Sequence, residues 1–227
     1  MTNITLGKSV NINGMNVNDM LLALKYGADP NQTDHFGDTA LINASCGGNV
    51  EVVELILAHG ADINQTDRFG ITALINASLY GKTEVVKLLL AHGADVNQTN
   101  GLGITALIYA SLEGHIEIVE LLLAHGTNVN HASLSGITAL TDASREGHTE
   151  VVKLLLAHGA DVNQTNQRGN TALMLVSLNG NTEVVELLLA HGADVNQTNR
   201  LSFTALMLAS HYRHTEIINL LRKHGAV

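Results

Sequence analysis

The sequence is nearly devoid of cysteine, proline and aromatic residues, and each shortage excludes a class of structure. Its 227 residues include one cysteine, Cys46, one proline, Pro30, and no tryptophan, and aromatic residues make up only 3%. A single cysteine excludes an internal disulfide framework and favours a reducing compartment. With so few aromatic residues, the core must be built from Leu, Val, Ile and Ala, which suits thin stacked helices better than a broad sheet sandwich.

Positive charge and long hydrophobic runs are also scarce. The formal net charge is −9, which disfavours nucleic acid as a partner because binding a phosphate backbone needs clustered Lys and Arg. No apolar run approaches the roughly 20 residues of a membrane span, and the N-terminus lacks the apolar core of a signal peptide. We therefore expect a soluble, intracellular, cytoplasmic protein that binds neither nucleic acid nor membranes.

The most informative feature that is present is a repeat of 33 residues, which occurs six times in succession from Asp34 to Gly225. Its clearest marker, Thr-Ala-Leu, begins at Thr39, Thr72, Thr105, Thr138, Thr171 and Thr204. A fixed period of about 20 to 50 residues is typical of a solenoid, in which each repeat buries its apolar face only against its neighbours. Such a chain has no central pocket, so its function must be sought on its surface.

Each repeat contains two short apolar segments. The first begins at Thr-Ala-Leu and in the first five copies ends at a glycine such as Gly147. The second, for example residues 84–93, has apolar residues at i, i+1, i+4 and i+5, a glutamate in its first turn and His-Gly at its end. This pattern predicts two antiparallel helices, the second ended by glycine and followed by a loop of turn-forming residues.

The motifs Gly-x-Thr-Ala-Leu, Gly-His-x-Glu-Val-Val and Leu-Leu-Leu-x-His-Gly-Ala-Asp-Val-Asn together resemble the ankyrin repeat, in register from Asp34 to Ala226. One departure is that the family's usual Thr-Pro-Leu-His reads Thr-Ala-Leu-Ile, Thr-Ala-Leu-Met or Thr-Ala-Leu-Thr. The resemblance implies an all-α ankyrin-repeat solenoid of stacked helix-turn-helix units. It also implies projecting hairpin-like loops, or fingers, and a groove that binds other proteins.

The repeat pattern also predicts the domain organisation, as one continuous domain. The expected parts are a partial N-terminal capping repeat (1–33), five full repeats (34–66, 67–99, 100–132, 133–165 and 166–198) and a C-terminal capping repeat (199–227). In the last repeat, Arg213, Arg222 and Lys223 replace the Gly, Leu and Ala of the other copies. Polar residues where a further repeat would dock are typical of a terminal cap.

Histidines are the residues that most resemble a functional site. Six of the twelve recur at the period of the repeat, at the end of the second helix. Adjacent copies would lie about 8 to 10 Å apart, too far to share a zinc ion, so we interpret them as structural. His211 and His214 form one local cluster, without an acidic or cysteine ligand. We therefore predict no catalytic, cofactor-binding or metal-binding residue, and no enzyme activity.

Positions that differ between copies do not hold the repeats together and are therefore available to contact a partner. They lie at the tip of each finger, directly after it and on one face of the first helix, and they hold six of the seven Phe and Tyr residues. Such aromatic and aliphatic residues are typical of protein interfaces. The predicted partner-binding residues are Phe36, Phe69, Ile71, Leu79, Tyr80, Leu102, Ile104, Tyr109, Leu112, Ile137, Arg145, Leu178, Leu201, Phe203 and Tyr212.

Three hypotheses for these residues remain open, beside an enzyme hypothesis that only the patch of His211 and His214 could support. In the first, a monomeric array binds another protein of unknown identity, with Tyr80, Tyr109 and Leu112 as central anchors. In the second, the array is a structural scaffold or spacer that self-associates through the same apolar stripe. In the third, neighbouring fingers pack on one another and cover some of the side chains, above all the isoleucines, because β-branched residues suit such contacts.

Overall fold

The computed structural model of the chain describes residues 12–227, which form two compact units divided after Gly101. Unit 1 ends at Gly101 and over residues 12–101 contains five helices: α1 (Val17–Lys25), α2 (Ala40–Gly47), α3 (Val50–Ala58), α4 (Ala73–Leu79) and α5 (Thr83–Ala91). Unit 2 is Leu102–Val227 and contains eight helices: α6 (Ala106–Leu112), α7 (Ile116–Ala124), α8 (Ala139–Glu146), α9 (Thr149–Ala157), α10 (Ala172–Asn179), α11 (Thr182–Ala190), α12 (Ala205–His211) and α13 (Thr215–Lys223).

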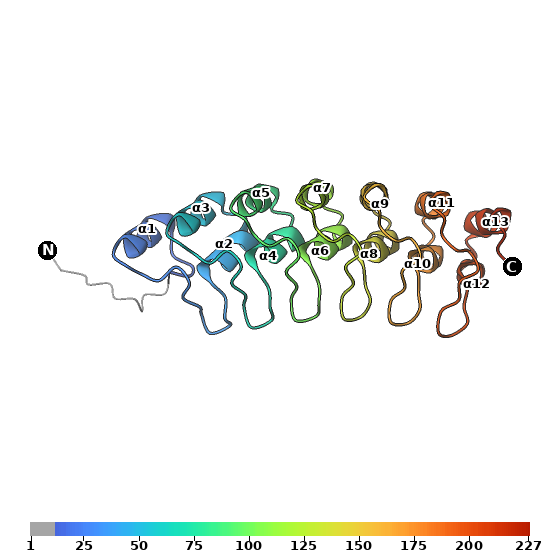
Figure 1. Ribbon diagram of the computed structural model, residues 1–227, viewed down its shortest axis with the longest axis horizontal. Helices are drawn as coiled ribbons and strands as arrows, with labels where there is room; N and C mark the ends of the chain where they lie inside the picture. The colour runs from blue at the N-terminus through green and yellow to red at the C-terminus, as the bar shows by residue number, and fades with distance from the viewer. Residues whose placement is uncertain (1–11) are drawn as a thin grey trace. The chain divides into compact units, whose positions relative to one another are not determined.

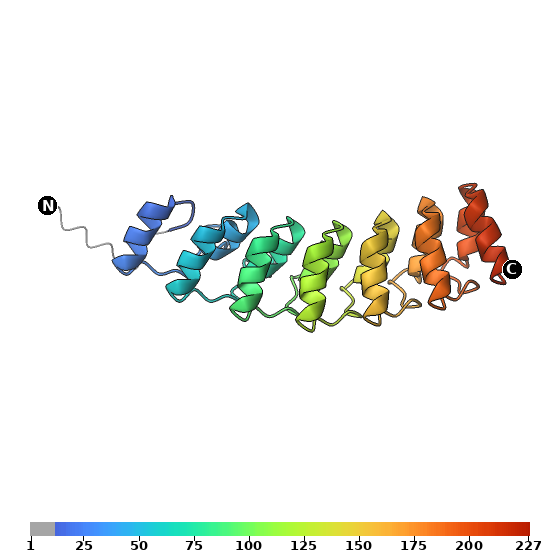
Figure 2. The ribbon, with the colours of Figure 1, turned by 90° about the horizontal axis from the view of Figure 1, so that it is seen from above.

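Each unit is a stack of helix pairs. In unit 2 the first helices of successive repeats, α6, α8, α10 and α12, pack in one row, and the second helices, α7, α9, α11 and α13, pack in another. Unit 1 repeats the arrangement with α2 and α4 in one row and α1, α3 and α5 in the other. In both units the loops between repeats project past the row of first helices (Figure 1), and the second helices of unit 2 lie side by side (Figure 2). The structure confirms the predicted all-α solenoid architecture.

The Thr-Ala-Leu marker starts the first helix of every full repeat. The threonine is the N-cap, and its Oγ1 accepts a hydrogen bond from the backbone N–H three residues later, as Thr171 does from Met174 at 3.3 Å. Ala172 and Leu173 follow in the first turn and are 1% exposed. The first turn of this helix therefore needs a capping threonine, a small buried residue and a large buried apolar residue, which explains why these three residues repeat.

The second helices supply the aliphatic core predicted from composition. In α9, Val151, Val152 and Leu155 are fully buried, and α11 repeats the pattern with Val184, Val185 and Leu188. Burying each such side chain stabilises the fold by about 1.5 to 3 kcal/mol. The stack is thus held by Val and Leu and needs no aromatic residue.

The recurring histidines close the ends of the second helices. In His158, Nδ1–H donates to the carbonyl of Leu154 at 2.8 Å, and the equivalent bond is present in all six copies. Asparagines of the Asn-Gln-Thr loops connect neighbouring repeats: the Asn163 amide accepts from the Asp194 backbone N–H at 2.8 Å and donates to the Gly192 carbonyl at 3.2 Å. Both recurring residues therefore bind backbone groups, as expected of structural residues.

Two glycine positions show what stacking demands of the backbone. Gly169 has φ +76°, and a Cβ there would lie 3.0 Å from the Arg200 backbone nitrogen in the next finger. At the equivalent place in the finger 199–203, Ser202 adopts φ +63°. Arg213, with φ +61°, likewise stands where Gly180 occupies the previous repeat. At these two places glycine both adopts the positive φ and fits the room that the neighbouring repeat leaves.

Candidate functional site

The fingers are built alike in both units. We use the name finger for the loop tips 34–38 and 67–71 in unit 1, and 133–137, 166–170 and 199–203 in unit 2. The first residue of each finger folds the tip. Asn166 Oδ1 accepts from the backbone N–H groups of Arg168 and Asn170 at 2.9 and 3.1 Å, and Asp67 Oδ1 accepts from those of Phe69 and Ile71 at 2.8 Å each.

Neighbouring fingers of unit 2 are hydrogen-bonded to one another. The backbone N–H of Gln167 donates to the Ser135 carbonyl at 2.9 Å, and that of Arg200 donates to the Arg168 carbonyl at 3.0 Å. The side chain of Asn199 adds a bond to Asn170 Oδ1 at 2.8 Å. These bonds join the three fingers into a wall beside the first helices.

Two adjoining cavities lie between this wall and the helices α8, α10 and α12. The apolar cavity has a volume of about 480 Å³. It is lined by Gln167, Arg168, Asn170, Met174, Leu175, Leu178, Asn199, Arg200, Leu201, Phe203 and Leu208. The polar cavity has a volume of about 510 Å³ and is lined by Ser135, Ile137, Thr141, Asp142, Arg145, Asn166, Gln167, Arg168, Asn170 and Leu175. The cavities share four residues, and together we call them the unit 2 groove.

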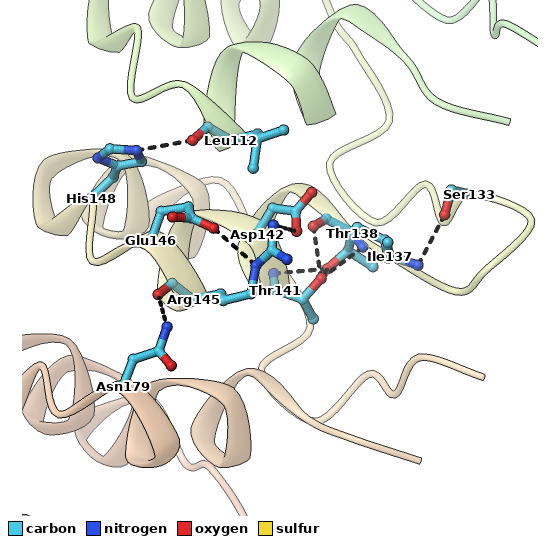
Figure 3. A network of polar contacts seen from close by, with 10 residues as sticks. All are labelled: Leu112, Ser133, Ile137, Thr138, Thr141, Asp142, Arg145, Glu146, His148 and Asn179. Atoms are coloured by element: carbon cyan, nitrogen blue, oxygen red, sulfur yellow. Dashed lines mark hydrogen bonds and ion pairs between the residues drawn. The ribbon is translucent and has the colours of Figure 1, made fainter. Parts of the chain in front are cut away.

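An ion pair between the buried Asp142 and the half-buried Arg145 (Figure 3) lines the polar cavity. Asp142 is only 6% exposed, and its Oδ1 lies 3.0 Å from Nη2 of Arg145. Nε of the same arginine lies 3.0 Å from Glu146 Oε1. Burial raises the pKa of the Asp142 carboxyl above its ordinary value; Arg145 opposes the shift and Glu146 adds to it. The positive charge of Arg145 is therefore already compensated within the protein.

Further hydrogen bonds hold this part of the groove in place (Figure 3). Thr138 and Thr141 form a capping box at the start of α8, in which Thr141 Oγ1 accepts from the Thr138 backbone N–H at 2.9 Å. From the next repeat, Asn179 Nδ2 donates to the Arg145 carbonyl at 2.7 Å. On the other side of α8, His148 Nε2 lies 2.9 Å from the Leu112 carbonyl, as a donor. The helix is tied to both neighbouring repeats.

Five of the predicted partner-binding residues line the unit 2 groove: Ile137 and Arg145 in the polar cavity, and Leu178, Leu201 and Phe203 in the apolar one. Leu201 is 76% exposed and Phe203 is 44% exposed. Leu178, Ile137 and Arg145 are half-buried. The structure therefore places residues from three repeats around one hollow surface.

The other predicted residues lie outside these two cavities. In unit 2 they are Leu102, Ile104, Tyr109, Leu112 and Tyr212, and in unit 1 they are Phe36, Phe69, Ile71, Leu79 and Tyr80. Phe36, Phe69, Tyr80, Leu102 and Tyr212 are between 51% and 68% exposed, and the remainder are half-buried. Tyr80 belongs to unit 1, whereas Tyr109 and Leu112 belong to unit 2. A role for these residues in binding stays a prediction.

The groove also contains residues that the prediction omitted. Leu175 and Leu208 line the apolar cavity. Asp142, which occupies the equivalent position in the preceding repeat, lines the polar cavity. Arg168 and Arg200 are exposed and lie at the rim of the apolar cavity. All five occupy positions that vary between copies. Differences between the copies identify these positions in the sequence. They do not show which of the positions line the same cavity, because that depends on how successive repeats stack.

The structure also describes the surroundings of the histidine cluster. His214 Nε2 lies 3.1 Å from the Leu178 carbonyl, as a donor to the preceding repeat, and Tyr212 lies between His211 and His214, with ring contacts to both. Within residues 12–227, no three His, Cys, Asp or Glu side chains gather closely enough to hold a metal ion. Over the same range, no helix has both the length and the apolar character needed to cross a membrane.

Comparison with known proteins agrees with this architecture. A family model described as "Ankyrin repeats (3 copies)" matches the chain three times, over residues 9–100, 98–166 and 158–227. Repeats of this kind generally mediate binding to other proteins and are typically not enzymes. No curated protein matches the chain.

Proposed function

Because the chain belongs to the ankyrin repeat family, we propose that unit 2 is a non-catalytic module that binds a segment of a partner protein in its groove. The observation that carries the proposal is the apolar cavity, in which Leu175, Leu178 and Leu208 from the helices meet Leu201 and Phe203 from the last finger. Its volume of about 480 Å³ is within the range of ligand pockets, about 300 to 1,000 Å³. Large apolar side chains around such a hollow are typical anchors for a partner.

The arrangement of the wall supports a binding role. Gln167 and Arg200 donate backbone hydrogen bonds to the preceding finger, so the wall of the groove is connected before any partner arrives. A preformed groove loses little conformational entropy on binding, which leaves more of the interaction energy for affinity. The module therefore needs no rearrangement to receive an extended segment.

Site-specific photo-crosslinking in cells tests this proposal. Benzoylphenylalanine placed at position 203, on the last finger, is expected to crosslink one or a few discrete partner proteins. The same group at position 186, an exposed site on α11, is the matched control and is expected not to label them. Addition of Leu201→Ser should abolish crosslinking from position 203. Equal labelling from both positions would refute binding in the groove.

Self-association is a second candidate, supported by one observation. Met207 is 49% exposed on α12, whereas Met174 at the equivalent position of α10 is fully buried. A second copy of the chain could cover this apolar face. Sedimentation velocity across a hundredfold range of concentration tests it: a dimer that Met207→Gln weakens supports self-association, and a monomer throughout excludes it.

We also propose that the protein works inside the cell. Its only cysteine, Cys46, is a free, half-buried thiol, as expected of a protein in a reducing compartment. Imaging of the chain tagged with a fluorescent protein should show it in the cytoplasm, and secretion into the medium would contradict the proposal.

A further inference from the structure

We propose that the segment held in the unit 2 groove is acidic: a large apolar side chain fills the apolar cavity, and Asp or Glu residues beside it pair with Arg168 and Arg200. This inference rests on the proposed function, because it names the chemistry of the partner for the same groove. It follows from the charges at the rim of the cavity.

Arg168 and Arg200 stand together at this rim. Both line the apolar cavity and both are exposed. The backbone N–H of Arg200 donates to the carbonyl of Arg168 at 3.0 Å, so the two side chains start from adjacent points of the wall. Two guanidinium groups at the edge of an apolar hollow suit a ligand that combines an apolar group with carboxylates, because each guanidinium can bind a carboxylate through two parallel hydrogen bonds.

Nothing in the described part of the chain neutralises these two arginines. The fingers 166–170 and 199–203 contain no Asp or Glu, and no ion pair within residues 12–227 involves either side chain. Arg145, in the adjoining polar cavity, differs because it lies 3.0 Å from Asp142 and 3.0 Å from Glu146. The uncompensated positive charge of the groove is therefore carried by Arg200 at the apolar cavity and by Arg168, which lines both cavities.

The fold does not require the finger 166–170 to lack an acid. In unit 1, Asp67 folds its finger through the same two backbone hydrogen bonds that Asn166 makes in unit 2. An aspartate at position 166 would preserve the turn and place a carboxylate close to Arg168, whereas at position 199 the amide is also needed as the donor to Asn170 Oδ1. The neutral amide leaves the arginines available to an acidic partner.

The net charge of −9 opposes an acidic partner only at long range. At physiological ionic strength the Debye length is about 8 Å, so charges farther from the bound segment are largely screened. The two arginines at the rim act at contact distance. The apolar cavity beside them favours an amino-acid side chain over a nucleic acid, whose backbone would use the arginines but leave the cavity unfilled.

The first step of the test is a selection from a display library of random nine-residue peptides, with the full chain as bait. The proposal expects enriched peptides in which a Leu or Phe has an Asp or Glu within two residues. Peptides that bind the groove, as shown by loss of binding to Leu201→Ser, but have no acidic bias would overturn this inference and leave the proposed function standing. If no enriched peptide is sensitive to Leu201→Ser, the proposed function fails as well.

The second step measures affinity by fluorescence anisotropy with one selected peptide and its twin in which Asp and Glu become Asn and Gln. The double variant Arg168→Gln, Arg200→Gln should lower the affinity for the acidic peptide by roughly 2- to 30-fold, as expected for two exposed ion pairs. It should leave the affinity for the neutral twin unchanged. Arg222→Gln with Lys223→Gln, on α13, removes the same charge elsewhere and should change neither. Equal effects of the two double variants would overturn the local pairing.

A third step separates the possible sources of the anion. Addition of inorganic phosphate, at constant ionic strength, should compete only weakly, because phosphate cannot fill the apolar cavity. A labelled single-stranded oligonucleotide is expected to bind less tightly than the peptide. If the oligonucleotide binds more tightly and depends on the same two arginines, the groove is a nucleic-acid site and the proposal is wrong.

Discussion

In unit 1 the fingers begin with Asp34 and Asp67, whereas in unit 2 they begin with Ser133, Asn166 and Asn199. The side-chain oxygen of each residue accepts the same two backbone hydrogen bonds. The turn therefore needs an oxygen but not a charge. The scaffold therefore leaves the charge of each finger free to vary.

The acidic residues of the finger 34–38 carry an electrostatic cost. Asp38 has a raised pKa because burial disfavours its carboxylate, and the neighbouring Asp34 and Asp67 raise it further. His35 opposes the shift. Carboxylates that repel one another on adjacent fingers do not help the fold.

The largest expected effect comes from breaking the finger packing that both units share. In Gly70→Ala or Gly169→Ala, the new Cβ would meet backbone of the next finger at 2.9 to 3.0 Å, and the residue would keep a positive φ. We expect each to lower the free energy of unfolding by about 2 to 4 kcal/mol, from a left-handed backbone and a displaced neighbour. Urea denaturation followed by circular dichroism measures the loss.

Gly159→Ala is the matched control for this prediction. Gly159 also has a positive φ, +82°, but nothing lies within 4 Å of the position of its Cβ. Its substitution should therefore cost only the backbone strain, about 1 to 2 kcal/mol. If Gly169→Ala costs no more than Gly159→Ala, the close approach of neighbouring fingers is not what demands glycine.

A smaller effect is expected from removing the oxygen that folds the finger. Asp67→Ala in unit 1 and Asn166→Ala in unit 2 each leave two backbone N–H groups without their partner, and we expect each to cost about 0.5 to 2 kcal/mol, as for a lost helix N-cap. Amide hydrogen exchange should show faster exchange at Phe69 and Ile71 in the first variant, and at Arg168 and Asn170 in the second. A loss confined to the aspartate variant would mean that charge, and not the oxygen, holds the turn.

The sequence was sufficient to predict the fold because the same local signals recur six times: the Thr-Ala-Leu marker, paired apolar segments and the glycine of His-Gly after the second segment. It also identified the positions at which the copies differ. It could not single out Arg168, Arg200 and Leu208, since their meeting around one cavity depends on the offset between successive repeats. The i, i+3 spacing of Asp142 and Arg145 could have indicated their ion pair, but the burial of the Asp142 carboxylate depends on how the repeats stack.

The third prediction concerns Asp142, the buried acid that has no equivalent charge in unit 1, where Asn43 and Asn76 take its place. Burial raises its folded-state pKa above the ordinary value of 3.8, so the folded protein holds this proton more tightly than the unfolded chain does. The contribution of Asp142 to stability therefore declines as the pH rises from about 3.8 through the raised value. Asp142→Asn should be more stable than the wild type at neutral pH.

Thermal unfolding between pH 3 and pH 8 measures this difference. The advantage of Asp142→Asn should vanish at the acidic end, where Asp142 is protonated in both states. Glu186→Gln, an exposed site on α11, removes one negative charge without removing a buried one and serves as the control. An advantage that does not change with pH would show that Asp142 acts through packing and not through its charge.

The smallest effect on stability is expected from exchanging the charges of the two kinds of finger. Asp67→Asn and Asn166→Asp preserve the oxygen that accepts both backbone hydrogen bonds, so each should change the free energy of unfolding by no more than about 0.5 kcal/mol.

The affinity for an acidic peptide should respond differently to the two exchanges. Asn166→Asp places a carboxylate on the finger that carries Arg168 and should weaken an acidic peptide by roughly 1.4- to 5-fold, the range for one exposed charge interaction. Asp67→Asn lies in unit 1 and should leave that affinity unchanged. Anisotropy titrations of both variants at low and high salt test this prediction. The loss of affinity caused by the charge at position 166 should become smaller at high salt, because salt screens the charge. A distorted finger would instead lower the affinity equally at both salt concentrations.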